Sequence, residues 1–240
     1  MAQDRSLLAW IEGSSNPVTL LRFYRWSVPT VSLGRNQAPH ESVCAEFCRC
    51  AGIPIVERPT GGRAVLHDLE VTYSLVSNDF SCFPERSLRN TYHRIATALK
   101  AGLERLGVQA NLADAGRGAR SVSRDTRPCF ATTSRSEILC RNRKLAGSAQ
   151  RRLRRSFLQH GSIPLHVDYA KMAAALGVSP RLLRDSLISI SEAAGRSVPF
   201  EEAARALRLG FETTFSVRLD AVPSATDYTR QIAPGEPNML

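Results

Sequence analysis

Apolar residues recur at helical spacing in several stretches of the chain. Leu7, Leu8 and Ile11 share one face of Asp4–Glu12, and the same spacing runs through Ser87–Leu106. Both stretches are therefore predicted to be amphipathic helices. Further helices are predicted at Glu41–Ala51, Tyr169–Leu176, Pro180–Leu187 and Pro199–Phe215.

Short β-rich or alternating runs lie between these helices. They predict strands at Val18–Trp26, Thr30–Leu33, Ile53–Glu57, Arg63–Leu66, Val71–Val76, Val108–Leu112, Glu137–Cys140, Lys144–Gln150 and Phe157–Pro164. The Gly-, Ser- and Arg-rich stretch Ala113–Pro128 predicts a loop. Hairpin-like strands combined with long helices favour an α+β fold, with a mixed β-sheet and packed helices. No internal repeat or break in composition appears, so a single domain over residues 1–240 is expected, with a loosely ordered tail after Ala221.

Composition places the chain among soluble globular proteins. Hydrophobic residues make up 43% and charged residues 22%, and there is no run of 18 apolar residues to span a membrane. The first residues, Met1–Arg5, lack the basic and apolar regions of a secretory signal. Six cysteines at irregular spacing do not resemble a disulfide framework. We therefore expect a cytoplasmic protein without a membrane partner.

The net charge of +10 comes almost wholly from arginine, of which the chain has 29 against three lysines. Twelve basic residues lie between Arg117 and Arg155, opposed only by Asp125 and Glu137. A cationic face of this kind attracts an acidic protein or a nucleic acid, or is simply solvated. No zinc finger, helix-turn-helix or RNA-binding aromatic motif accompanies it, which disfavours nucleic acid as the partner.

The first segment with candidate chemistry is Arg58–Asp68, of sequence RPTGGRAVLHD. Its two glycines let the backbone approach a ligand closely and expose N–H groups. Arg58 is suited to holding a carboxylate or phosphate, and His67 with Asp68 to orienting a polar group. A Gly-Gly pair alone also predicts an ordinary hairpin turn, so the segment needs support from elsewhere in the chain.

The second region begins at Cys129, which is followed fifteen residues later by KLAGSAQ and then by LQHGSI. Cys129 ends an arginine-rich stretch, where positive potential favours the thiolate form. Arginines around Lys144 favour a neutral amine in the same way. A thiolate with an amine partner is suited to acyl transfer, although a lone cysteine is more often a buried apolar residue.

The other cysteines are weaker candidates. Cys140 is the rival nucleophile, but its predicted position within a strand makes it the poorer choice. Cys44, Cys48 and Cys50 lie on one short segment without a fourth ligand, so no metal site is expected and they are interpreted as ordinary helix residues.

Taken together, RPTGGRAVLHD with the TYS that follows it, KLAGSAQRR and LQHGSI resemble the biotin/lipoate protein ligase superfamily. Within it, the chain is most similar to the lipoate ligase-like octanoyltransferases, which take octanoyl from acyl carrier protein. The resemblance extends to Arg22–Trp26, Pro29–Gly34 and Arg205–Phe215. It implies a fold like the catalytic domains of class II aminoacyl-tRNA synthetases and biotin protein ligases.

The resemblance also implies a catalytic pair, Cys129 and Lys144, with a substrate-binding set around it. Lys144 would point at the reacting carbonyl, and His160 with Gly161 would close the pocket opposite the Gly-Gly turn. The implied substrate-binding residues are Arg58, Thr60, Gly61, Gly62, His67, Tyr73, Gly147, Ser148, Gln150, His160 and Gly161.

Two reactions occur on this scaffold, and the sequence favours one of them. The octanoyltransferases pass the acyl group through their own cysteine and need no cofactor, whereas the ligases activate a free acid with ATP and Mg. Cys129 at the position of the acyl-bearing cysteine favours the transferase. Arg63 also favours it, because the family's ligases have a third glycine at this position. The expected absence of an accessory C-terminal domain favours it as well.

The partners implied by the resemblance are acyl carrier protein as the octanoyl donor and a lipoyl protein as the acceptor. The acceptor would be the lipoyl domain of a 2-oxoacid dehydrogenase or the glycine-cleavage H protein. A module that binds nucleic acid or lipoyl proteins without catalysis is an alternative from a different class. The presence of both Cys129 and Lys144 disfavours it, because binding alone has no need of the pair.

Overall fold

The computed structural model describes residues 1–38, 43–83, 87–113 and 137–221. Cys129, all but the first residue of the predicted loop at Ala113–Pro128, and the tail after Ala221 lie outside these ranges. The described helices are α1 (Ala2–Gly13), α2 (Ala45–Cys50), α3 (Leu88–Glu104), α4 (Tyr169–Leu176), α5 (Pro180–Ser186), α6 (Ile190–Ala194) and α7 (Phe200–Phe215). The described strands are β1 (Thr19–Tyr24), β2 (Thr30–Leu33), β3 (Ile55–Glu57), β4 (Val65–His67), β5 (Glu70–Ser77), β6 (Asn111–Leu112), β7 (Ile138–Cys140), β8 (Arg143–Arg152) and β9 (Phe157–Pro164).

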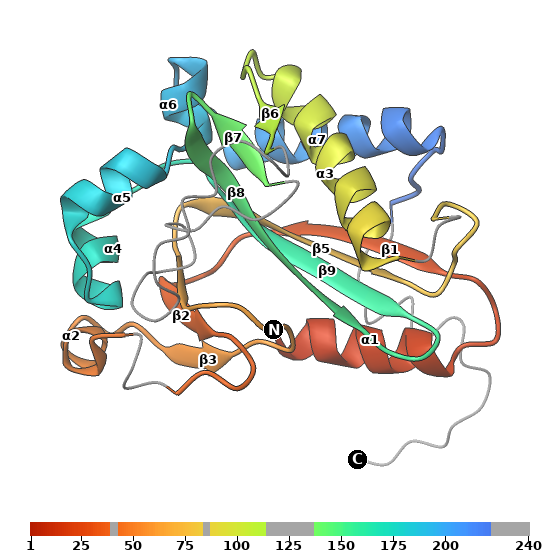
Figure 1. Cartoon of the computed structure of the whole chain (residues 1–240), viewed down its shortest axis with the longest axis horizontal. Helices are drawn as coiled ribbons and strands as arrows, with labels where there is room; N and C mark the ends of the chain where they lie inside the picture. Colours follow the sequence, from red (N-terminus) through yellow and green to blue (C-terminus); the bar gives the residue numbers. More distant parts are fainter. Residues whose placement is uncertain (39–42, 84–86, 114–136, 222–240) are drawn as a thin grey trace.

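The strands form two sheets, shown in Figure 1. Six antiparallel strands make the larger sheet in the order β1-β5-β9-β8-β7-β6, and β3-β2-β4 make the smaller one. Strand β2 pairs in parallel with β3 and antiparallel with β4. Mixed pairing is thus confined to the small sheet, and the predicted α+β fold class is confirmed.

The two faces of the larger sheet are covered by different helices. Successive side chains of a strand point to opposite faces, so β5 contributes to two separate cores. Val71, Tyr73 and Leu75 share one core with the apolar residues of α3 and α7. On the opposite face, Val76 and Leu158 pack against the apolar side of α1.

Helices α3 and α7 touch backbone to backbone where they cross. A Cβ atom placed on Gly102 would lie 2.6 Å from Cα of Leu207, and one on Gly210 would lie 2.3 Å from the carbonyl oxygen of Ala98. Contacts this short do not occur for real side chains, so glycine at both positions permits the close approach. The crossing holds the helical layer against the β5 face of the sheet.

Most predicted elements are present with small shifts at their ends. Strands at Thr30–Leu33 and Phe157–Pro164 and the helix at Tyr169–Leu176 begin and end where the sequence predicts. Helix α2 occupies only the second half of its predicted range, and α6 was not predicted. None of the helices in the described part of the chain is long and apolar enough to cross a membrane.

Candidate functional site

A cavity lies between the two sheets, on the face of the larger sheet that α1 covers. It encloses about 370 Å³ of empty space, counting its opening to solvent. Strands β2 and β4 supply one wall and β5, β8 and β9 the other. Six of the predicted binding residues line it: Arg58, His67, Gly147, Ser148, His160 and Gly161.

One wall of the cavity contains a row of hydrogen bonds that runs from Ser32 through His67 to Glu70. Ser32 Oγ lies 2.7 Å from His67 Nε2, and His67 Nδ1 lies 2.8 Å from Glu70 Oε1. All three side chains are buried. The indole of Trp26 stacks on the imidazole, with ring centroids 4.5 Å apart. The His67 ring is therefore held at both nitrogens and on one face.

The Glu70 carboxylate is the polar centre of this wall. The hydroxyls of Thr72 and Ser162 donate to its two oxygens, and His67 Nδ1 forms a hydrogen bond with the oxygen that Thr72 contacts. A buried carboxylate needs several donors to remain stable away from water. Glu70 therefore links the large sheet, through Thr72 and Ser162, to the small sheet through His67.

A second row, from Asp4 through His160 to Thr60, joins α1 to the large sheet and to the Gly-Gly turn. His160 Nδ1 lies 3.2 Å from Asp4 Oδ2, and His160 Nε2 lies 2.6 Å from Thr60 Oγ1. Arg22 Nη1 holds the other Asp4 oxygen at 2.9 Å. All three side chains of this row are buried.

The charges of this second row follow from its environment. Burial alone would raise the pKa of the Asp4 carboxyl, but the hydrogen bond from His160, the charge of the N-terminus and the hydroxyl of Ser74 together outweigh it, so the pKa lies below its usual value. Burial lowers the pKa of His160 despite the opposing effect of Asp4. Asp4 is therefore a carboxylate and His160 a neutral imidazole near pH 7. Because the carboxylate only accepts, Nδ1 carries the imidazole proton and Nε2 accepts from the hydroxyl of Thr60.

The guanidinium of Arg58 forms hydrogen bonds with the turn that follows it. Its Nε and Nη2 donate to the carbonyl of Gly61, Nη2 donates also to the carbonyl of Arg63, and Nη1 donates to the carbonyl and hydroxyl of Ser32. These bonds shape the turn beside the cavity. That Arg58 also holds a carboxylate or phosphate stays a prediction.

The two glycines of the turn have different reasons to be glycine. Gly62 has a φ of +99°, a conformation that other residues rarely adopt. Its carbonyl oxygen also lies where a Cβ on Gly34 would come within 1.8 Å, so Gly34 must lack a side chain. By contrast, a Cβ on Gly61 would meet nothing within 4 Å. Neither Gly61 nor Gly62 lines the cavity, and both act through the shape of its rim.

Tyr73 and Gln150 lie in a hydrogen-bonded row beside the cavity and not in its lining. Gln150 donates to Gln159 at 3.1 Å, Gln159 donates to the Tyr73 hydroxyl at 3.0 Å, and Tyr73 donates to Ser148 at 2.7 Å. Burial raises the pKa of Tyr73 to about 12, so its hydroxyl remains a donor. A Cβ on Gly161 would lie 2.6 Å from the Tyr73 ring, which fills that space. Through this chain of hydrogen bonds, Tyr73, Gln159 and Gln150 hold the hydroxyl of Ser148 in place.

Lys144 lies on β8 with its amine in a buried ion pair. Nζ is 2.6 Å from Glu137 Oε1, and the two side chains are 3% and 5% exposed. The sequence placed Lys144 among arginines, but its contact is a carboxylate. The contact with Glu137 holds the amine of Lys144 in a fixed place, and its catalytic role stays a prediction. It does not contribute to the lining of the cavity.

The predicted partner of Lys144, Cys129, lies outside the described residues, so the catalytic pair stays a prediction. Cys140 ends β7 and is buried, in keeping with its interpretation as a structural residue. Cys48 is a buried residue of α2, and Cys50 is an exposed one. Among the residues that the structure describes, no three His, Cys, Asp or Glu side chains are grouped to hold a metal ion.

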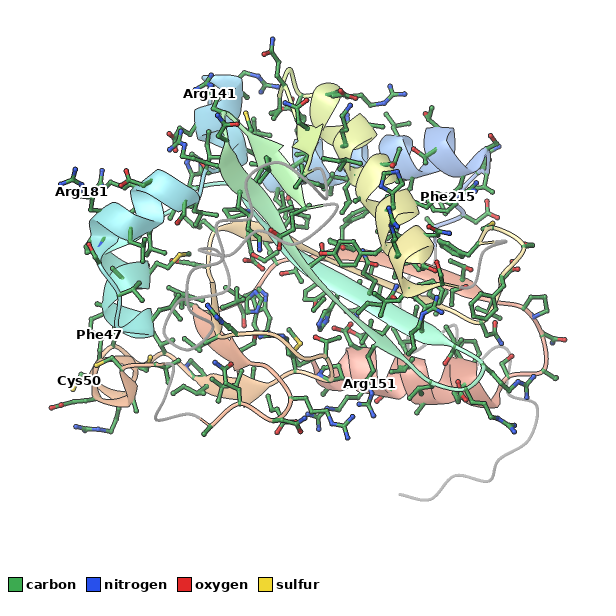
Figure 2. All side chains as sticks on the ribbon, viewed as in Figure 1. Phe47, Cys50, Arg141, Arg151, Arg181 and Phe215 are labelled. Carbon is green, nitrogen blue, oxygen red and sulfur yellow. The ribbon has the colours of Figure 1, made fainter. Side chains whose placement is uncertain are left out.

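The described part of the basic run extends along β8. Figure 2 labels Arg141 and Arg151 toward opposite ends of this strand, whose ten residues extend about 30 Å. At one end Arg143 pairs with Glu192 of α6. At the other end the backbone of Arg155 donates to Glu12 of α1. Docking of an acidic partner on the basic run stays a prediction.

Sequence reasoning missed several residues that build the site. Asp4, Ser32 and Glu70 have no motif of their own, and their partners lie far along the chain. A weak signal exists for two of them. Ser32 stands between apolar Val31 and Leu33, and Glu70 opens an otherwise uncharged strand. An isolated polar residue within a buried strand indicates a buried polar contact, but does not identify it.

The fold and the cavity together define a catalytic domain of the lipoate protein ligase type. Over residues 1–212 the chain matches the family described as lipoyl protein ligase A/B catalytic domain, and it belongs to that family. It is 41% identical to octanoyltransferase LipM from Moorella thermoacetica over 189 residues, which span 79% of this chain and 68% of the relative. It is 36% identical to octanoyltransferase LipM from Kyrpidia tusciae, spanning 92% and 84%.

Solved structures agree with the fold. A lipoate-protein ligase A bound with ATP superposes with a TM-score of 0.75 at 23% identity, over 96% of this chain and 86% of that one. A bipartite lipoate protein ligase from Thermoplasma acidophilum superposes with a TM-score of 0.70 at 21% identity, over 96% and 87%. At this level of identity the similarity concerns the fold alone.

Proposed function

We propose that this protein is an octanoyltransferase of lipoate biosynthesis. In the proposed reaction, the octanoyl group leaves acyl carrier protein, forms a thioester with Cys129, and passes to a lysine of a lipoyl domain or of the glycine-cleavage H protein. The observation that carries the proposal is the similarity to octanoyltransferases over most of the chain. The cavity between the sheets supports it, because six of the substrate-binding residues that the resemblance implies line it.

The chemistry of the proposed route needs no external energy source. Exchange of one thioester for another is nearly isoenergetic, and the final formation of an amide runs downhill. In the first step the Cys129 thiolate attacks the acyl carbonyl, and the thiolate of the carrier leaves. In the second step a neutral lysine amine attacks and the Cys129 thiolate leaves. The protein then has to position the groups and stabilise the oxyanion.

Lys144 is proposed to act in this route as a fixed cation. Its ion pair with Glu137 keeps the ammonium buried and oriented. An ammonium stabilises negative charge that develops on a thiolate or a carbonyl oxygen. It has no lone pair, so taking up the proton of the acceptor amine is not assigned to Lys144.

ATP-dependent lipoate ligation is the other reaction of the scaffold. A ligase must hold the phosphates of ATP, and an arginine beside a Gly-Gly turn would be a natural anchor. Arg58 donates to the carbonyl groups of Ser32, Gly61 and Arg63 and to the hydroxyl of Ser32. The transferase without ATP and Mg is preferred because the relatives that the chain matches over most of its length are octanoyltransferases.

The proposal is tested by transfer without ATP. The purified protein would be mixed with octanoyl-acyl carrier protein and an isolated lipoyl domain, and the mass of the domain followed with time. We expect octanoylation of the domain in the absence of ATP. Modification only with free lipoate or octanoate plus ATP would assign the protein to the ligases instead.

A further inference from the structure

The cavity wall places a hydroxyl, an imidazole and a carboxylate in hydrogen-bonded order. Ser32 Oγ is 2.7 Å from His67 Nε2, and His67 Nδ1 is 2.8 Å from Glu70 Oε1. This is the order in which an orienting acid, a base and a hydroxyl act in proton transfer. Both Ser32 and His67 line the cavity. A substrate in the cavity would therefore lie against the hydroxyl end of the row.

The direction of each hydrogen bond can be worked out from the fixed donors. Trp26 donates its N–H to Thr72 at 2.9 Å, so the Thr72 hydroxyl proton is directed to Glu70. Ser162 also donates to Glu70. A carboxylate with these donors accepts from His67 as well, which puts the imidazole proton on Nδ1. Nε2 then accepts from the hydroxyl of Ser32.

Arg58 acts on the same hydroxyl from the other side. Its Nη1 lies 3.2 Å from Ser32 Oγ and donates to it. The oxygen of Ser32 thus lies between a permanent cation and the lone pair of an imidazole. A nearby cation stabilises negative charge on an oxygen, so the hydroxyl gives up its proton to His67 more readily than an isolated serine would.

Two other groups are less suited to accept a proton from a substrate. Lys144 is an ammonium in a buried pair with Glu137. His160 lines the cavity, but the hydroxyl to which it is bonded, that of Thr60, does not. Within the described residues, the row from Ser32 is the one whose hydroxyl and imidazole both reach the cavity.

We propose that His67, through the hydroxyl of Ser32, takes the proton that the acceptor amine loses when it attacks the acyl carbonyl. The inference rests on the proposed function, in which the second step forms an amide. The new C–N bond forms and the thioester C–S bond breaks. The amine proton passes to Ser32 Oγ while the hydroxyl proton passes to His67 Nε2. The imidazolium then returns a proton to the leaving thiolate, and Glu70 and Trp26 act as positioning residues.

The charged neighbours of His67 come from three elements. Glu70 from β5 bonds to its Nδ1, and Arg58 lies across Ser32. His160 from β9 interacts with it electrostatically. Asp68, the next residue in sequence, bonds to Lys171 at 2.8 Å instead.

The test compares His67→Gln and Ser32→Ala with the wild-type protein. His166→Gln is the matched control, because His166 lies outside this cavity and bonds to Ser191. Octanoyl transfer from acyl carrier protein to a lipoyl domain would be followed in single turnovers between about pH 6 and 9, with unfolding midpoints recorded in parallel. A general base contributes roughly 100-fold or more, so a loss of that size is expected for both variants and none for the control.

Chemical rescue separates a base from a structural histidine. Added imidazole should restore part of the activity of His67→Ala and none of that of Ser32→Ala. An unchanged rate of transfer in His67→Gln would overturn the inference while leaving the transferase in place. A loss of transfer rate that parallels the fall in the unfolding midpoint, without rescue by imidazole, would also overturn it. If the wild-type protein transferred no octanoyl, the proposed function would fall and this inference with it.

Discussion

The amine of Lys144 and the carboxylate of Glu137 form an ion pair of 2.6 Å in which both side chains are almost wholly buried. Burying one charge without the other is unfavourable, because the interior cannot replace the lost hydration. The pair therefore fixes the start of β8 to the residue before β7.

Removing one partner of this pair should destabilise the protein strongly. We expect Glu137→Gln to lower the free energy of unfolding by about 3–5 kcal/mol, measured by urea denaturation. The double variant Glu137→Leu with Lys144→Met should recover much of that loss while transferring no octanoyl, which separates stability from catalysis. Glu202→Gln, which breaks the exposed pair with Arg196, is the control and should not shift the midpoint measurably. A Glu137→Gln midpoint equal to that of the control would contradict this account.

The crossing of α3 and α7 should not tolerate a methyl group. Gly102→Ala places a Cβ atom 2.6 Å from Leu207 Cα, so the helices must separate. A loss of about 1–3 kcal/mol in unfolding free energy is expected from such overpacking. Gly13→Ala, at the end of α1 with nothing within 4 Å, is the control and should leave stability unchanged or higher. Equal stability of the two variants would show that the crossing is looser than described.

Substitution by alanine in the Gly-Gly turn should reduce activity at Gly62 and be tolerated at Gly61. Gly34→Ala would place its Cβ 1.8 Å from the carbonyl oxygen of Gly62, so the turn has to move and the rim of the cavity with it. We expect a large fall in octanoyl transfer for Gly34→Ala and for Gly62→Ala. Gly61→Ala, which meets no atom within 4 Å, should keep the activity. The opposite order of activities would mean that Gly61 itself contacts the substrate.

Stability should fall as the solution is acidified from neutral pH. His160 has a folded pKa below its ordinary value of 6.5, so the unfolded chain binds its proton first and stability declines below about pH 6.5. Asp4 has a folded pKa below 3.8, so its contribution is present above that value and is lost as pH falls further. Urea midpoints between about pH 5 and 7.5 should therefore rise with pH, less steeply in His160→Gln. A wild-type midpoint that rises on acidification would contradict the description of His160.

The local structure could be predicted from the sequence because local patterns determine it. Helical spacing and the stop at Gly177 are enough to define Tyr169–Leu176. The five-residue helix Ile190–Ala194 was missed, since a pattern of that length covers little more than one turn. The division into two sheets was not predicted either, because strand pairing depends on contacts between distant segments.

The site shows the same limit at the level of single residues. Motifs identified His67 and His160, but not Glu70 and Asp4, which orient them. The sequence also does not show that Arg58 donates to carbonyl groups of its own turn. The arginines around Lys144 suggested repulsion, whereas the fold brings Glu137 to its amine. The contacts of Glu70, Asp4 and Glu137 depend on the fold, which local patterns do not determine.

The central claim is that octanoyl passes through Cys129, and the mass of the intact protein tests it most directly. The wild-type protein would be incubated with octanoyl-acyl carrier protein without ATP, beside Cys129→Ser and, as the matched control, Cys140→Ser. The account predicts an added octanoyl group on the wild type and on Cys140→Ser that hydroxylamine removes, and none on Cys129→Ser. An octanoyl adduct that persists in Cys129→Ser and disappears in Cys140→Ser, or no adduct while the lipoyl domain is still modified, would contradict it.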